Sequence, residues 1–422
     1  MHTLNAGAGE AEILFPEELF PTPGENYTGV HDNPYAHAIC MEQENDGRDA
    51  IFVILTLDLV NYSDPGELRR LAAEKTGAEE KNILIHCNHT LSTPHGAMHK
   101  TSPSDELYDQ KYRETIKIAA GEALRAAKAS IRPAKIGFGT AFSYVNVSRI
   151  AELKDGVWQG TNEGGLSDHT IPVICLSDNS EQKPIAILYA VNMAAGVLEG
   201  SLSSDGGRLV SADIAGASSH YLREIFPGAV CAYCIGASGD QWQALRAVTD
   251  YLAADGTIHS EDRHEDGFVY CDGLGRRLAS SITEAVRHLQ AGSAESLIRM
   301  QTWDFVYDGQ KELGRDFRFM QPGTDIVFEH AEDVHSDVSI MTIGNIAVVA
   351  AHAEIDVQTL MNIRTAVNGK NIFFMEFTNG DGGYMTEKYI YDACGYQCRK
   401  SRFYRGSAEK FEQNVIGCLK EI

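Results

Sequence analysis

Short apolar runs alternate with longer amphipathic stretches along most of the chain. A near-continuous apolar run indicates a strand that is covered on both faces, whereas apolar residues at helical spacing indicate a helix. Because strands and helices alternate, the pattern predicts an α/β fold. Strands are expected at residues 50–59, 82–89, 134–144, 183–193, 229–235, 297–303, 339–349 and 372–377, and helices at 65–74, 107–129, 211–226, 273–290, 357–368 and from 408 onwards.

Two long segments fall outside this alternation. Residues 14–37 are rich in proline, glycine and aromatic residues and predict an ordered loop packed on the core. Residues 254–269 are polar and charged and predict a loop or lid. The chain has no Pro/Ser linker and no repeat, so residues 1–422 are expected to form a single domain.

Composition narrows the classes of function. The formal net charge is −23 and the pI is near 5.0, which disfavours binding to nucleic acid. We find neither an apolar run long enough to span a membrane nor a signal peptide. Nine cysteines, an odd number, fit free thiols in a reducing compartment. These features predict a cytoplasmic protein whose partner is a small-molecule substrate, with its oligomeric state left open.

The most unusual stretch is residues 82–99, where a short apolar strand leads into four histidines. Imidazoles at the C-terminal end of a strand suit a metal or acid–base site in an α/β protein. The two-residue period of a strand puts His86 and His89 on opposite faces, so only one of them reaches a given site. The alternative is that they are surface or capping residues. The four histidines are His86, His89, His95 and His99.

Polar residues also stand where other predicted strands end. Ligands in open α/β sheets bind at the carboxyl ends of strands, so these residues are candidates for one site. The chain lacks the signatures of common zinc proteases, α/β-hydrolases and P-loop enzymes. The strand-end candidates are Asp58, His89, Asn192, Asp240, Glu354 and the loop 379–384.

Eight motifs in order along the chain give it a family resemblance. Among them are V-H-D-N-P-Y-A-H-A from residue 30, N-H-T-L-S-T-P-H from residue 88 and L-V-S-A-D-I-A-G from residue 209. Further along come G-A-S-G-D-Q-W-Q from residue 236, A-H-A-E-I from residue 351 and G-G-Y-M-T from residue 382. The chain resembles the catalytic domain of the neutral/alkaline (non-lysosomal) ceramidases over nearly its whole length. The resemblance implies a layered α/β domain with two central sheets flanked by helices, here without the C-terminal immunoglobulin-like domain of many ceramidases.

The resemblance also implies a zinc site. In that family two histidines, a glutamate and a tyrosine hold zinc, which activates water to cleave the amide of an N-acyl sphingosine. By motif, His89 matches the first histidine, Glu354 the glutamate and Tyr384 the tyrosine, while Arg149 matches an arginine that lines the site. Asp240 matches the aspartate of the family's A-G-D motif.

Three positions depart from the family. Gly196 stands where the family has its second zinc histidine, Leu91 replaces another histidine, and Trp242 replaces a serine. Zinc needs about four ligands, so His352 or His95 would have to replace the lost one. Otherwise zinc gives way to another divalent metal, or Glu354 and Tyr384 act as base and acid without metal.

The sequence therefore favours a divergent ceramidase-like hydrolase, or lyase, for a small polar metabolite. Trp242 narrows the pocket and offers a stacking face, which suits a compact substrate better than two lipid chains. Two alternatives stay open. One is a zinc-dependent ceramide amidase in which other residues have replaced the lost metal ligand, and the other is an inactive small-molecule-binding protein. Candidate catalytic residues are Glu354, Tyr384, Arg149 and Asp240; substrate-binding residues Trp242, His95, Asn192 and Ser238; and metal ligands His89, Glu354, Tyr384 and His352.

Overall fold

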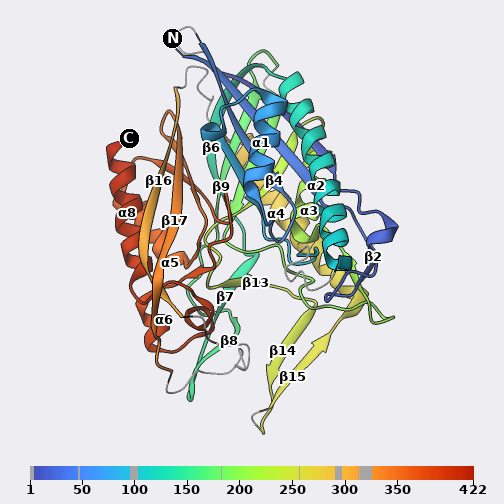
Figure 1. Ribbon diagram of the computed structural model, residues 1–422, viewed down its shortest axis with the longest axis vertical. Coiled ribbons are helices and arrows are strands. Elements are labelled where there is room, and N and C mark those ends of the chain that lie inside the picture. Colours follow the sequence, from blue (N-terminus) through green and yellow to red (C-terminus); the bar gives the residue numbers. More distant parts are fainter. Residues whose placement is uncertain are drawn as a thin grey trace.

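The computed structural model is shown in Figure 1. It describes residues 4–45, 48–95, 103–181, 183–255, 257–289, 297–311, 313 and 326–422. Of the four clustered histidines, His99 lies outside the described residues.

Two sheets form the centre of the fold. The larger has eight strands in the order β12-β10-β9-β6-β1-β3-β4-β5, and the smaller has four in the order β16-β17-β18-β20. The larger sheet consists of β1 (Leu4–Glu12), β3 (Tyr35–Asn45), β4 (Arg48–Leu57), β5 (Ile83–Cys87), β6 (Arg132–Phe142), β9 (Thr170–Asp178), β10 (Pro184–Val191) and β12 (Val230–Ile235). The smaller consists of β16 (Ile298–Gln310), β17 (His330–Ile343), β18 (Ile346–Ala351) and β20 (Asn371–Met375).

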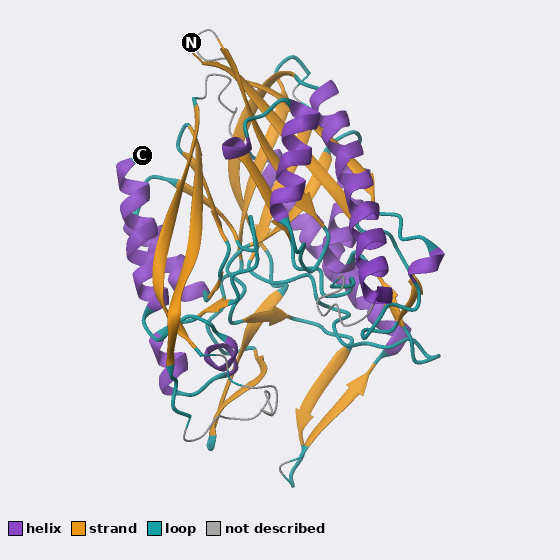
Figure 2. Cartoon of the chain, viewed as in Figure 1, coloured by secondary structure: helices purple, strands orange, loops and turns teal. Residues whose placement is uncertain are grey.

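Helices cover the outer faces of both sheets, as Figure 2 shows. On the larger sheet one apolar cluster packs against the first two helices and another against the next two; a further cluster joins the smaller sheet to the last long helix. The helices are α1 (Pro65–Thr76), α2 (Pro103–Ala129), α3 (Asp213–Ile225), α4 (Gly267–Arg287), α5 (Val357–Ala366), α6 (Lys388–Asp392), α7 (Tyr396–Lys400) and α8 (Ser407–Glu421).

The two sheets pack face to face. Ile39, Ile54 and Leu188 of the larger sheet share one buried cluster with Val348 and Phe373 of the smaller sheet. Burying both faces of each sheet explains the near-continuous apolar runs in the sequence. The predicted α/β class with two central sheets flanked by helices is confirmed.

Short strands and a hairpin lie below the sheets in Figure 1. The strand β7 pairs with β13 on one side and with β8 on the other, and β14 and β15 form a projecting hairpin. These and the remaining short elements are β2 (Tyr27–Val30), β7 (Asn146–Leu153), β8 (Gly156–Asn162), β11 (Arg208–Val210), β13 (Gln241–Gln243), β14 (Val248–Leu252), β15 (Ile258–Asp262), β19 (Glu354–Ile355), β21 (Tyr384–Met385), and the 3-10 turns Glu17–Leu19, Glu80–Asn82 and His264–Asp266.

Four expected elements are wrong in detail. The strand expected at 82–89 ends at Cys87, so the two-residue period does not reach His89, whose φ is 55°. Residues 254–269 are no simple loop, because they contain β15 and the start of α4. Residues 339–349 form two strands joined by a turn at Gly344 (φ 61°) rather than one strand. The expected loop at 14–37 contains β2 and the start of β3.

The N-terminal strand β1 gave no apolar signal, because after Leu4 it contains only alanine, glycine, asparagine and glutamate. A Cβ at Gly7 would lie 2.2 Å from the carbonyl oxygen of Ala127, and one at Gly9 2.4 Å from that of Ala123. Both carbonyls belong to α2. Small residues therefore let the helix approach this strand closely, at the expense of the usual strand pattern.

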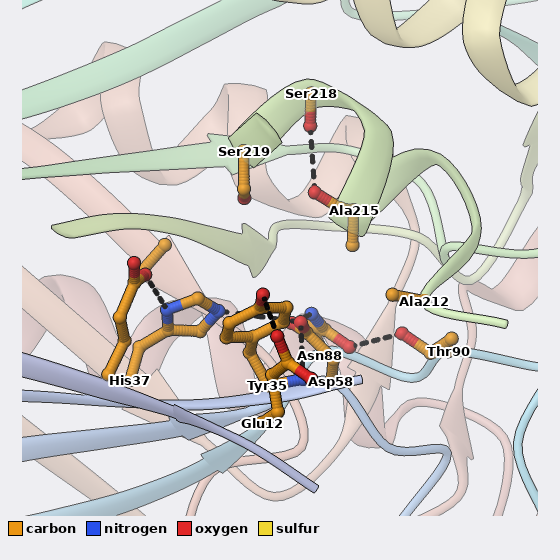
Figure 3. A network of polar contacts seen from close by, with 12 residues as sticks. Glu12, Tyr35, His37, Asp58, Asn88, Thr90, Ala212, Ala215, Ser218 and Ser219 are labelled. Atoms are coloured by element: carbon orange, nitrogen blue, oxygen red, sulfur yellow. Dashed lines mark hydrogen bonds and ion pairs between the residues drawn. The ribbon is translucent and has the colours of Figure 1, made fainter. Parts of the chain in front are cut away.

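A buried polar network fixes the loop after β5 (Figure 3). Asn88 donates its amide to Asp58 Oδ1 at 2.6 Å, and Thr90 donates its hydroxyl to Asn88 Oδ1 at 2.6 Å. Asp58 Oδ2 lies 3.4 Å from Nε2 of the fully buried His37. Asn88 and Thr90 flank His89, so this network sets the position of that histidine.

Candidate active site

The centre of the candidate site is a buried ion pair. Arg149 of β7 is 7% exposed and Glu354 of β19 is 6% exposed. Arg149 donates Nε and Nη2 to the carbonyl oxygen of Gly239, at 3.1 and 2.6 Å, and its Nη2 lies 3.4 Å from Glu354 Oε1. Burial raises the pKa of Glu354 to about 7, although the charge of Arg149 opposes this.

Tyr384 lies beside this pair because β21 runs parallel to β19, which places it opposite Glu354. The guanidinium carbon of Arg149 is 5.1 Å from the centre of the Tyr384 ring and 5.9 Å from that of Tyr396, distances at which cation–π attraction operates. Burial raises the pKa of Tyr384 well above its usual value, so its phenol stays protonated and can donate a hydrogen bond.

Ser238 connects Glu354 to a second carboxyl group. Its hydroxyl donates to Glu376 Oε2 at 2.7 Å and lies 3.3 Å from Glu354 Oε1. Glu376 is completely buried, and its Oε1 accepts the backbone N–H of Ile355. Glu376 therefore holds both Ser238 and the strand that carries Glu354. Sequence reasoning missed this residue, although it is the first polar residue after the apolar strand β20.

Asp240 adjoins the ion pair through its backbone rather than its side chain. Its carbonyl oxygen accepts the N–H of Arg149 at 2.8 Å, whereas its Oδ1 accepts the N–H of Val357 at the start of α5. Burial and the neighbouring Asp356 raise the pKa of Asp240 to about 8. The second aspartate, Asp356, was also missed; its Oδ2 accepts the N–H of Glu387.

His89 is half-buried and is oriented by its surroundings. Its Nδ1 lies 2.8 Å from the carbonyl oxygen of Val60, and its ring stacks on Phe377 with centroids 4.0 Å apart. A carbonyl acceptor puts the proton of the neutral ring on Nδ1 and leaves Nε2 as the free acceptor. Burial lowers the pKa of His89, which favours this neutral form.

The other predicted residues occupy different surroundings. His95 pairs through Nδ1 with Glu25, and Asn192 is braced between Asp168 and the N–H of Ala237. His352 follows β18, and burial lowers its pKa. Trp242 stacks with Arg246 at 4.0 Å in the wall of a surface pocket. His86 is a buried core residue with partners on both nitrogens, Thr378 and Ile235.

The described residues do not fit a four-ligand zinc site. No three His, Cys, Asp or Glu side chains within the described ranges gather closely enough to hold a metal ion. A Cβ at Gly196 would lie 2.8 Å from Leu91 Cδ1 and 2.9 Å from Gln243 Nε2, so these two side chains fill the space next to that glycine. His89 has a carbonyl partner on Nδ1, as metal-binding histidines usually do. The carboxylate of Glu354, in contrast, already pairs with Arg149.

Restoring the missing histidine by Gly196→His is expected to destabilise the fold without creating a zinc site. The larger side chain must displace Leu91 and Gln243, which costs about 1–3 kcal/mol. Urea unfolding and elemental analysis after zinc addition would measure the two effects, with Gly196→Ala as the smaller control. One tightly held zinc ion per Gly196→His chain, at unchanged stability, would contradict this expectation.

Comparison with known proteins supports the fold. Neither a scan against family models nor a search of curated proteins finds a match. Among solved structures, the neutral ceramidase from Pseudomonas aeruginosa superposes with a TM-score of 0.72 at 16% identity, covering 100% of this chain and 75% of that one. A ceramidase complexed with C2 gives 0.71 at 15% identity, covering 99% and 75%. The chain therefore has a divergent neutral-ceramidase-like fold, as its motifs predicted.

Proposed function

We propose that this protein is a hydrolase that cleaves an amide bond in a small polar molecule. The observation that carries the proposal is the meeting of Arg149, Glu354 and Tyr384, which come from three separate segments of the chain. Amide hydrolysis needs a base to activate water, positive charge for the oxyanion and a proton for the leaving nitrogen. These three side chains offer one group for each task.

In the proposed mechanism, Glu354 accepts a proton from the attacking water. Arg149, fixed by the carbonyl oxygen of Gly239, stabilises the negative charge that develops on the carbonyl oxygen of the substrate. Tyr384 donates a hydrogen bond to the departing nitrogen and relays to it the proton that Glu354 took from the water, so the phenol gives up one proton and regains another. Ser238 and Glu376 hold Glu354 in position, since both contact it or the strand that carries it. No step is assigned to a metal, because no three described His, Cys, Asp or Glu side chains gather closely enough to hold one.

We further propose that the natural substrate is not a long-chain ceramide and that the protein works in the cytoplasm as a single domain spanning residues 1–422. Leu91 and Gln243 occupy the space beside Gly196, which supports a compact substrate. All nine cysteines are free, and eight of them are buried, which supports a reducing compartment. No helix in the described ranges is long and apolar enough to cross a membrane.

Glu354→Gln is expected to lower turnover by about 100- to 10,000-fold, the usual contribution of a general base. Release of amine from a panel of short N-acyl amides, with a long-chain ceramide included, would measure this. Glu387→Gln is the matched control, because Glu387 is a half-buried carboxyl near α5 outside the proposed machinery. Equal turnover of the wild type and Glu354→Gln, or no turnover of any amide, would refute the hydrolase; ceramide as the best substrate would refute the proposed substrate size.

A further inference from the structure

A pocket of about 380 Å³ lies between the end of β1, the β2–β3 turn, the start of β3 and the first turns of α3 and α4. We call it the α3 pocket. Its volume is in the range of pockets that bind small molecules. Its lining contains none of Arg149, Glu354 and Tyr384, so it is separate from the candidate active site. The apolar part of its wall is formed by aromatic and small residues: Tyr35, Ala212, Ala217, Tyr221, Phe268 and Cys271.

Glu12 places an uncompensated negative charge in this wall. Its Oε2 accepts the side-chain amide of Asn33 at 2.8 Å, and its Oε1 accepts the hydroxyl of Tyr35 at 2.9 Å. Both donors are neutral, so among the described residues the carboxylate is hydrogen-bonded but its charge has no counter-ion. Glu12 is exposed, and Figure 3 shows it beside Tyr35, beneath Ala212 at the start of α3. A ligand in the pocket can therefore reach this carboxylate.

The groups in the wall that carry or can carry positive charge are already paired with carboxylates. The pairs are Arg223 with Glu10 at 3.0 Å, His31 with Asp32 at 2.7 Å and His220 with Glu224 at 3.4 Å. Asp272 is likewise matched, by Arg276 at 3.0 Å, and the remaining carboxyl, Asp213, is buried and adds no positive charge. The wall is therefore negative even if both of its histidines are protonated, and Glu12 carries the excess charge.

The charge of the wall favours an organic cation over a metal ion. No three His, Cys, Asp or Glu side chains in the described part of the chain gather closely enough to hold a metal ion. An ammonium group needs fewer protein ligands, because it brings its own N–H donors to a carboxylate. The aromatic part of the wall can bury an apolar body attached to that group. An anionic ligand, in contrast, would be repelled by Glu12.

Two residues of the wall also contact the loop after β5. Ser211 donates its backbone N–H to the carbonyl oxygen of Ser92 at 3.0 Å. Tyr35 donates its backbone N–H to Asp58 Oδ2 at 3.1 Å, and Oδ1 of the same carboxylate accepts the amide of Asn88. A ligand that packs against Tyr35 and Ser211 therefore restrains the loop at both of its ends.

We propose that the α3 pocket binds an organic ammonium ion with an aromatic or branched apolar body, that Glu12 is its counter-charge, and that its binding stabilises the loop that carries His89. The proposal goes beyond the proposed function and does not depend on it, since neither binding nor the stability of the loop requires turnover.

Three probes of similar shape test the charge preference: phenethylamine, 2-phenylethanol and 3-phenylpropanoate. Calorimetry and ligand-detected NMR at low salt measure their affinities. Phenethylamine is expected to bind about tenfold more tightly than 2-phenylethanol, as a hydrogen bond to a charged group should provide, and added salt is expected to reduce this preference. Equal binding of the alcohol, tighter binding of 3-phenylpropanoate, or no binding of any probe would each overturn the proposal.

Variants of Glu12 locate the contact. Glu12→Gln is expected to weaken phenethylamine about tenfold and to leave 2-phenylethanol unchanged, whereas Glu12→Lys is expected to favour 3-phenylpropanoate. Because Glu12 is exposed, neither change disturbs the core. Glu284→Gln is the matched control: it removes an exposed carboxylate about 18 Å further along α4 than Asp272 and is expected to change no affinity. An unchanged affinity of Glu12→Gln for phenethylamine would show that Glu12 is not the counter-charge.

Amide hydrogen exchange tests the effect on the loop. With phenethylamine at about ten times its Kd, exchange at residues 88–92 is expected to slow by up to about tenfold, if opening of the loop releases the ligand. Exchange in α8, which packs on the other sheet, is expected to stay the same. Glu12→Gln at the same amine concentration is expected to show a smaller effect. Binding of the amine with unchanged exchange at residues 88–92 would refute the link between the α3 pocket and His89.

Discussion

The free energy of unfolding is expected to fall by about 3 kcal/mol or more as the pH rises from about 4 to about 9. Most soluble proteins are instead most stable between about pH 5 and 8. The expected loss arises from buried groups that hold a proton more tightly in the folded chain than in the unfolded chain. Asp240 and His37 are the clearest of these.

Asp240 contributes over the lower part of this range. Burial and the charge of Asp356 raise its pKa from 3.8 to about 8. The folded chain therefore binds a proton that the unfolded chain has already lost. The stabilisation is complete below about pH 4 and disappears as the pH rises through about 8.

His37 acts in the same direction at higher pH. Burial alone lowers its pKa, but the carboxylates of Asp58 and Glu10 outweigh burial and raise the value from 6.5 to about 9. The pairing of the imidazolium is fully stabilising below about pH 6.5 and is lost as the pH passes about 9. A shift of this size corresponds to about 3 kcal/mol.

Urea unfolding at a series of pH values measures the effect. Asp240→Asn is expected to flatten the curve between about pH 4 and 8, and His37→Gln to flatten it between about pH 6.5 and 9. His288→Gln is the control for the histidine, because His288 is exposed and pairs with Glu284 one helical turn earlier. A wild-type curve that is level or rises towards pH 9 would show that these groups do not titrate as proposed.

Sequence predicted the layers well, because residues of buried strands and amphipathic helices carry a strong local signal. Besides β3 and β9, it missed β1, β7 and β8, the last three for a physical reason. The first of these strands uses glycine where α2 approaches it, and the other two lie outside the main sheets with polar and charged residues exposed. The pattern of polar and apolar residues in these strands depends on tertiary contacts, which a short stretch of sequence does not show.

The candidate site was predictable in part for the same reason. Motif order found Arg149, Glu354 and Tyr384, and the structure brings these three together. It could not find Glu376, because the role of that carboxyl depends on Ser238 and Ile355, which lie far from it in sequence. Sequence spacing also does not show that Asn192 donates a hydrogen bond to Asp168, or that His95 pairs with Glu25.

Arg149→Met is expected to cost about 3–5 kcal/mol of folding free energy, because it leaves a buried carboxylate without its partner. Glu354 would then lose its counter-charge at 3.4 Å, whereas the carbonyl oxygen of Gly239 would keep a second donor, Gln397 Nε2 at 3.0 Å. The loss therefore reflects mainly the unpaired charge of Glu354 and should shrink at low pH, where that group binds a proton.

The double variant Arg149→Met/Glu354→Gln tests this explanation. Replacing both partners removes the unpaired charge, so the double variant is expected to be at least about 1 kcal/mol more stable than Arg149→Met alone. Arg113→Met is the matched control: its pair with Glu67 is about one-quarter exposed, and such pairs contribute about 1 kcal/mol or less. Urea unfolding of the wild type, of both single variants and of the double variant gives the four free energies of this double-mutant cycle. If the two single losses simply add, Arg149 and Glu354 do not act as a pair, and the proposed charge arrangement of the active site is wrong.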